Sequence, residues 1–143
     1  MMDLDDDLSD IEADKLFDPR TRRLIALAEA YGQWDLAQEL AAPAAEGAIT
    51  MMPRPDESAP RKDHLLFEVT TRLVTEARAI GILGEAIDAS GHPGLADRMH
   101  DSIDHAASRA QAILITGPDS PFMTPLIEEH EAAIAELEAA AAQ

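Results

Sequence analysis

An apolar residue returns at every seventh position in the middle of the chain, and this series constrains the fold more than any other feature. Its members are Leu66, Leu73, Ile80 and Ile87. A seven-residue apolar repeat is typical of a helix that packs lengthwise against other helices. The series predicts one helix over about residues 64–90, with Asp63 as its N-cap and a length of roughly 40 Å. Further helices have to cover such a helix along most of its length.

The composition supports a fold made only of helices. Alanine, the best helix former, occurs 27 times among 143 residues, and only five residues are aromatic. An all-β sandwich would need more aromatic and β-branched residues. The chain has no cysteine, which excludes disulfides and thiolate metal sites.

Two more apolar stripes predict the partners of the long helix. One lies within about residues 93–116 and the other within about residues 124–142, where Thr124 and Pro125 begin a helix. The first stripe is Leu95, Met99, Ile103, Ala106, Ala110 and Ile113, and the second is Ile127, His130, Ile134, Leu137 and Ala141. The connection Gly91–Pro93 is so short that the first two helices should form an antiparallel hairpin.

A smaller helical hairpin is predicted over residues 18–46. Asp18 and Pro19 begin its first helix, Gly32 ends it, and Asp35 caps the second. We expect Trp34, in the turn between them, to hold the hairpin against the body of the protein.

The predicted architecture is therefore all-α, a helical bundle built on a long antiparallel hairpin of about 64–90 and 93–116. A C-terminal helix and the short N-terminal hairpin complete it. We expect residues 1–17 to be an acidic, flexible segment, 47–62 a proline-rich linker, and 63–143 a three-helix core. Residues 18–46 pack on that core, so the whole is one domain.

Negative charge is concentrated at the two ends of the chain. The formal net charge is −17, of which residues 1–18 carry −7 and residues 119–143 carry −6. Such a charge disfavours nucleic acid and anionic membrane surfaces and favours a basic protein partner, or adaptation to high salt. Glu136 and Glu138 lie at the C-terminal end of a helix, where the dipole disfavours acids. That end should fray or find a basic partner. No stretch has the features of a signal or a membrane span, so we expect a cytoplasmic protein.

The acidic N-terminal segment contains a possible recognition helix. Leu4, Leu8 and Ile11 would line one face of a helix, with Leu16 and Phe17 beyond it. An acidic segment with a few apolar side chains can fold on binding to a groove of another protein. The alternative is a solvated tail whose apolar residues pack loosely on the body.

Catalytic, metal and DNA-binding motifs find little support. His64 with Glu68, and Asp101 with His105, are half-sites at helical spacing. The hairpin would hold the two pairs roughly 15–20 Å apart, which is too far for one metal ion. Residues 27–40 are similar in spacing to a helix-turn-helix, but the second helix is acidic where DNA binding needs basic residues. We therefore expect no catalytic residues, no metal and no cofactor.

His130 interrupts the apolar stripe of the C-terminal helix. The bundle places it level with Glu68 and Arg72, so these three residues form a candidate polar core. A hydrogen-bonded structural histidine is one interpretation and a pH-sensitive contact is another. A ligand- or metal-binding bundle, as in some enzymes, would use the same three residues.

Small residues flank the seam of the long helix, namely Thr70, Ala77, Gly81 and Gly84. Glycine inside a helix is unfavourable by about 1 kcal/mol relative to alanine, and a close approach of another backbone can offset this. That backbone belongs either to the next helix of the same chain or to a second copy in a homodimer. The function that fits these observations is a non-enzymatic cytoplasmic regulator or adaptor that binds another protein.

Overall fold

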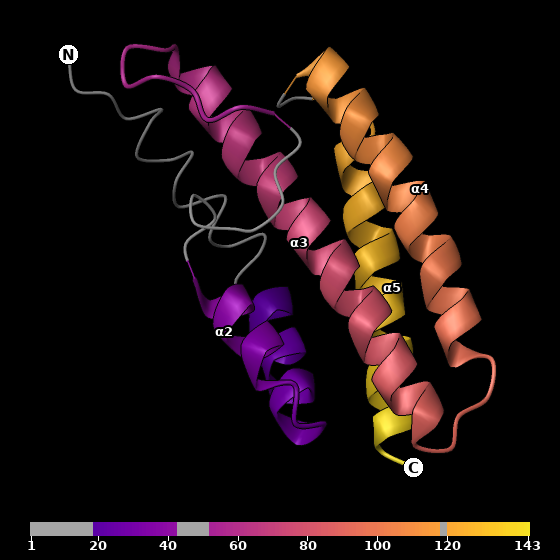
Figure 1. Cartoon of the computed structure of the whole chain (residues 1–143). Helices are drawn as coiled ribbons and strands as arrows, with labels where there is room; N and C mark the ends of the chain where they lie inside the picture. The colour runs from indigo at the N-terminus through magenta and orange to yellow at the C-terminus, as the bar shows by residue number, and fades with distance from the viewer. Residues whose placement is uncertain (1–18, 43–51, 118–119) are drawn as a thin grey trace.

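The computed structural model describes residues 19–42, 52–117 and 120–143, and the helices within these ranges confirm the all-α fold. The first helix covers residues 19–30. It is followed by α2 (Trp34–Ala41), α3 (Arg61–Ala89), α4 (Leu95–Thr116) and α5 (Met123–Ala141). In Figure 1, α3, α4 and α5 run side by side with alternating directions, and the N-terminal hairpin lies beside the C-terminal half of α3.

The long helix α3 is covered along its length as the seven-residue series predicts. Leu73, Ile80 and Ile87 are at most 1% exposed, and Leu66 is half-buried. The helix begins at Arg61, so the N-cap predicted at Asp63 is wrong; Pro60 precedes the helix. Proline has no N–H to satisfy, and Asp63 lies in the first turn, where the helix dipole favours a carboxylate.

The turn between α3 and α4 is longer than expected because two glycines adopt left-handed conformations. Gly91 has φ 118° and Gly94 has φ 87°, so α4 begins at Leu95 and not at Pro93. The carboxylate of Asp88, near the end of α3, accepts a hydrogen bond of 3.0 Å from the N–H of Ala96. This bond satisfies one of the free N–H groups at the start of α4 and fixes the hairpin.

The first residues of α2 and α5 also differ from the prediction. Trp34 is the first residue of α2, with Gln33 and not Asp35 at the N-cap position, and its side chain is 60% exposed. The expectation that Trp34 holds the hairpin to the body is therefore wrong; Leu36 and Leu40 do so instead. The helix α5 begins at Met123, one residue before the predicted cap at Thr124.

The apolar core consists of two clusters at different heights of the bundle. The first joins the N-terminal hairpin to the C-terminal half of α3, the start of α4 and the end of α5. The second joins the N-terminal half of α3 to the end of α4 and the start of α5. The first cluster includes Leu24, Leu27, Leu36, Leu40, Ile80, Leu83, Ile87, Leu95, Met99, Ile134 and Leu137, and the second consists of Val69, Leu73, Ala77, Ala106, Ile113 and Leu126.

Gly84 gives a test of how closely α3 and α4 pack. A Cβ atom at this position would lie 2.6 Å from Cγ and 2.8 Å from Cβ of Met99. We expect Gly84→Ala to destabilise the protein by about 1 kcal/mol, because overpacking outweighs the gain in helix propensity. Urea unfolding followed by circular dichroism measures the change. The same substitution in a Met99→Ala background should be less unfavourable, and a higher unfolding midpoint for Gly84→Ala alone would contradict the prediction.

Candidate functional site

Three ionisable side chains are buried together where the N-terminal hairpin meets the bundle. They are Arg20 from the first helix, Glu76 from α3 and His130 from α5, and each residue is 2% exposed. Ionisable side chains are rarely buried to this extent unless they are paired. The three residues, which we call the buried charge cluster, are therefore the first candidate for a functional site.

The carboxylate of Glu76 is the centre of this cluster. Nε of Arg20 donates to Oε1 over 2.8 Å, and Nη2 of Arg20 donates to Oε2 over 3.3 Å. Nδ1 of His130 lies 3.0 Å from the same Oε1. Because an ionised carboxylate only accepts hydrogen bonds, Nδ1 carries the proton and donates it. Nε2 of His130 is buried without a hydrogen-bond partner among the described residues.

A second, more exposed layer of ion pairs surrounds the cluster. Arg23 donates to Glu131 over 2.7 Å and to Glu138 over 2.6 Å. Nη1 of Arg20 lies 3.7 Å from Oε1 of Glu131. The hydrogen bond from Arg23 lowers the pKa of Glu138, and the hydrogen bonds to Glu138 and Glu131 raise the pKa of Arg23. Arg20 and Arg23 therefore hold the first helix against α5, and Arg20 also holds it against α3.

Of the predicted polar core of Glu68, Arg72 and His130, the structure pairs Glu68 with Arg72, whereas His130 pairs with Glu76. Nη2 of Arg72 donates to Glu68 over 2.9 Å, one turn apart on the same helix, and both side chains are partly exposed. His130 is buried as predicted but contacts Glu76, two turns further along α3 than Glu68. The axial offset between α3 and α5 sets this pairing, and spacing along one helix does not reveal it.

The small residues predicted for self-association are all buried within the chain. Thr70, Ala77, Gly81 and Gly84 lie on the covered side of α3, and Gly84 packs directly against Met99 of α4. The close approach at Gly84 is thus made inside one molecule. Its covered position leaves no room there for a second copy.

The predicted partner-binding residues Leu4, Leu8, Ile11, Leu16 and Phe17 lie outside the described residues. That hypothesis stays a prediction from the sequence.

Most acidic residues of α5 pair with arginines of neighbouring helices. Glu129 pairs with Arg109 and Glu136 with Arg98, both from α4, and Glu138 pairs with Arg23. Glu136 and Glu138 are the acids that we expected to cause fraying or to find a basic partner. Their partners are within the chain, so a basic partner from another protein is not needed to neutralise these two acids.

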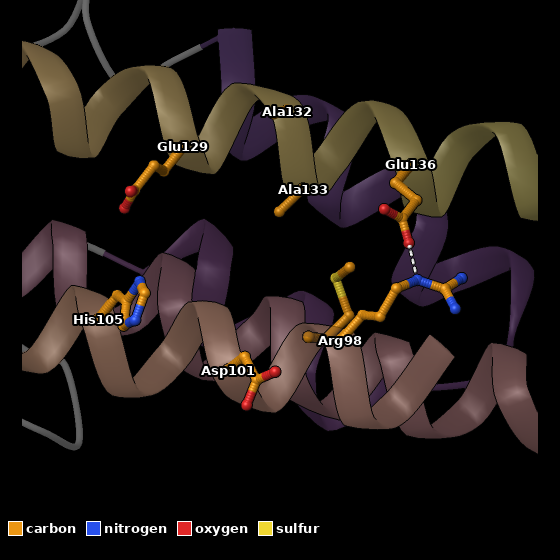
Figure 2. A pocket seen from close by; sticks show the side chains of 8 residues that line it. Arg98, Asp101, His105, Glu129, Ala132, Ala133 and Glu136 are labelled. Atoms are coloured by element: carbon orange, nitrogen blue, oxygen red, sulfur yellow. Dashed lines mark hydrogen bonds and ion pairs between the residues drawn. The ribbon is translucent and has the colours of Figure 1, made fainter. Parts of the chain in front are cut away.

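A hollow of about 310 Å³ lies between α4 and α5 (Figure 2). It is lined by Arg98, Met99, Asp101, His105, Glu129, Ala132, Ala133 and Glu136. In Figure 2 the ion pair of Arg98 and Glu136 crosses one end, and His105 and Glu129 face each other across the other end. Asp101 and His105 form one of the half-sites noted above. In the described ranges no three His, Cys, Asp or Glu side chains are arranged to hold a metal ion.

The burial of Glu76 and Arg20 could have been predicted from the sequence, because both residues lie in phase with buried apolar residues. Glu76 lies three residues after Leu73 and four before Ile80, in phase with the buried stripe of α3. Arg20 lies four residues before the buried Leu24. A charged residue in phase with an apolar stripe points to a buried ion pair.

Comparison of the chain with protein-family models, with curated proteins and with solved structures gave no match. Within the described ranges, no helix combines the length and the apolar character needed to cross a membrane.

The buried charge cluster predicts that replacing one of its side chains is worse than replacing all three. Glu76→Leu leaves Arg20 and His130 buried without their acceptor, and we expect a loss of about 3–5 kcal/mol in unfolding free energy. The triple variant Arg20→Met, Glu76→Leu, His130→Leu should lose clearly less, because no uncompensated charge stays buried. Guanidinium unfolding measures both. A triple variant less stable than Glu76→Leu would show that the cluster itself is strongly stabilising.

The pair of Arg23 and Glu138 predicts a contribution to stability that depends on pH. The pKa of Glu138 is lowered in the folded state, so the unfolded chain binds the proton first as the pH falls. The stabilisation is therefore present at neutral pH and is lost as the pH falls through the lowered folded-state pKa. Unfolding free energy measured against pH should have a smaller acid slope for Glu138→Gln than for the wild type. Glu128→Gln, which removes an exposed carboxylate of the same helix, is the control for the loss of one acid.

Proposed function

We propose that this protein is a non-enzymatic cytoplasmic adaptor that binds other proteins through two separate surfaces. One surface is centred on Trp34 at the start of α2. The other contains Ile115 and Phe122, on either side of the turn between α4 and α5.

The observation that supports this proposal is the placement of the large apolar side chains left exposed. Among the described residues these are Trp34, Ile115 and Phe122, which are 60%, 82% and 41% exposed. Single exposed apolar residues are common on protein surfaces. Aromatic residues, however, are enriched in protein interfaces and often dominate binding energy, and tryptophan does so most.

The two surfaces lie toward opposite ends of the molecule. In Figure 1 the N-terminal hairpin with α2 lies beside the lower half of α3, whereas the end of α4 and the start of α5 are toward the top of the bundle. Two partners could therefore bind without competing for the same residues, as the word adaptor implies.

The net charge favours basic partners. The chain carries −17, and long-range attraction raises the association rate with positively charged proteins. The intramolecular ion pairs of α5 account for Glu129, Glu136 and Glu138. The acids most available to a partner are therefore the remaining exposed ones, and the acidic segment 1–17 stays a predicted third element.

Affinity capture from source lysate with matched variants tests the proposal. Trp34→Ala should lose one set of bound proteins, and Ile115→Ser with Phe122→Ser should lose another. A chain without residues 1–17 tests the acidic segment separately. Gln111→Ala, at an exposed site of α4, is the control and should capture what the wild type captures.

Circular dichroism of each variant is needed to show that its fold is retained. Identical captures by the wild type and by both surface variants would contradict the proposal. Loss of the same proteins from both variants would support one continuous interface and would contradict the adaptor.

A further inference from the structure

The end of the molecule where α4 finishes and α5 begins is apolar and exposed. Two of the three large apolar side chains exposed among the described residues lie there, Ile115 at 82% and Phe122 at 41%. Pro121 and Pro125 are also exposed, and Met123 between them is partly buried against the second apolar cluster. We call these five residues the apolar tip.

A series of hydrogen bonds holds the end of α4 next to the start of α5. The N–H of Gly117 donates to the carbonyl of Ile113 over 2.7 Å, and the N–H of Ser120 donates to the carbonyl of Gly117 over 3.1 Å. The N–H of Met123 donates to the carbonyl of Ser120 over 3.2 Å, and the N–H of Phe122 donates to Oγ of Ser120 over 3.1 Å. The apolar tip is therefore built into the fold.

These bonds also decide what kind of surface can cover the tip. Phe122 and Met123 already use their N–H groups, and Pro121 and Pro125 have none. Backbone N–H groups that lose water without gaining a partner make burial unfavourable. Because these four residues present no such group, an apolar surface can cover them without that penalty.

The tip is the part of the chain with the least charge. Between Arg109 and Glu128 the sequence has one charged residue, Asp119, which lies outside the described ranges and is not part of the tip. Two copies of a chain with a net charge of −17 repel each other. At physiological ionic strength, charges more than about 8 Å apart are largely screened, so contact through an uncharged surface avoids most of this repulsion.

The same lack of charge disfavours the other partners of an acidic protein. A basic protein finds no carboxylate among the residues of the tip, and nucleic acid finds no cation there. In Figure 1 the C-terminus and the N-terminal hairpin lie away from the end of α4 and the start of α5. Two molecules that meet at their tips therefore keep these other parts far from each other.

We propose that the apolar tip binds the apolar tip of a second copy of this chain. A two-fold arrangement places Ile115 of one protomer near Phe122 of its partner, and each contact then occurs twice. The small residues of α3 are covered within one molecule, so the tip replaces them as the surface for self-association. This inference rests on the proposed function, since it names the occupant of one of the two surfaces and leaves Trp34 to a different protein.

Sedimentation equilibrium of the full chain, from micromolar to millimolar concentration, tests the proposal. The tip is smaller than a standard interface of about 1,600 Å², so we expect a dimer with a dissociation constant on the order of 100 µM. Raising NaCl from about 50 to 500 mM should tighten the dimer by about three- to tenfold, because salt screens the repulsion and leaves the apolar contact. A monomer at every concentration, or a dimer weakened by salt, would overturn the proposal.

Two lysine variants separate the tip from the net charge. Ile115 lies in the last turn of α4, where the helix dipole favours a cation, so Ile115→Lys should keep the fold. It also lowers the net negative charge, yet we expect self-association at least about tenfold weaker. Gln38→Lys makes the same charge change at an exposed site of α2 and should not weaken the dimer. Equal affinity of the two variants would overturn the proposal.

Cross-linking locates the contact independently, because the chain has no cysteine of its own. Ile115→Cys and Phe122→Cys chains are mixed and treated with a short bismaleimide, and we expect covalent dimers that contain one of each. Gln38→Cys chains at the same concentration are the control and should give few dimers. Equal yields from the two samples would show that the contact is not at the tip.

The outcome is distinguishable from the test of the proposed function. If the chain is always monomeric but Ile115→Ser with Phe122→Ser loses a captured protein, the adaptor stands and the occupant of the tip is another protein. If the chain dimerises through the tip but both surface variants capture the same proteins as the wild type, the adaptor is wrong and the self-association stands.

Discussion

The arrangement of the helices depends on the bonds that the carboxylate of Glu76 accepts. It receives Arg20 from the first helix and His130 from α5, and so joins three elements at one buried point. Apolar clusters lie above and below this point, and each alone would tolerate helices that slide along one another. A buried ion pair does not tolerate such sliding, because displacement would leave its charges without partners. The cluster therefore fixes the register that the apolar contacts leave open.

The sequence predicted the helices well because each depends on its own periodicity. The long hairpin, the C-terminal helix and the inward faces of Leu73, Ile80 and Leu137 followed from apolar spacing. The pairing of His130 with Glu76 did not follow, since it depends on the axial offset between two helices far apart in the chain. The exposure of Trp34 was also missed: its place in the predicted turn suggested an anchor, but the hairpin buries Leu36 and Leu40 instead.

The concentration of acids at the C-terminal end has a structural explanation. Glu129, Glu136 and Glu138 face arginines on α4 and on the first helix, so a segment that is strongly acidic in the sequence is locally balanced in the fold. Charge counted along the chain therefore overstates the charge that a partner meets at α5. Near the turn of the N-terminal hairpin, by contrast, Asp35 and Glu29 are exposed.

The ion pairs of the first helix also have a consequence for the order of events during synthesis. Arg20 precedes its partner Glu76 by 56 residues, and Arg23 precedes Glu138 by 115 residues. The N-terminal hairpin leaves the ribosome first, yet the groove that receives it is complete only after α5 has been made. Its apolar side, with Leu24, Leu36 and Leu40, is not fully covered until then, so the hairpin of a newly made chain exposes apolar surface to which a chaperone can bind.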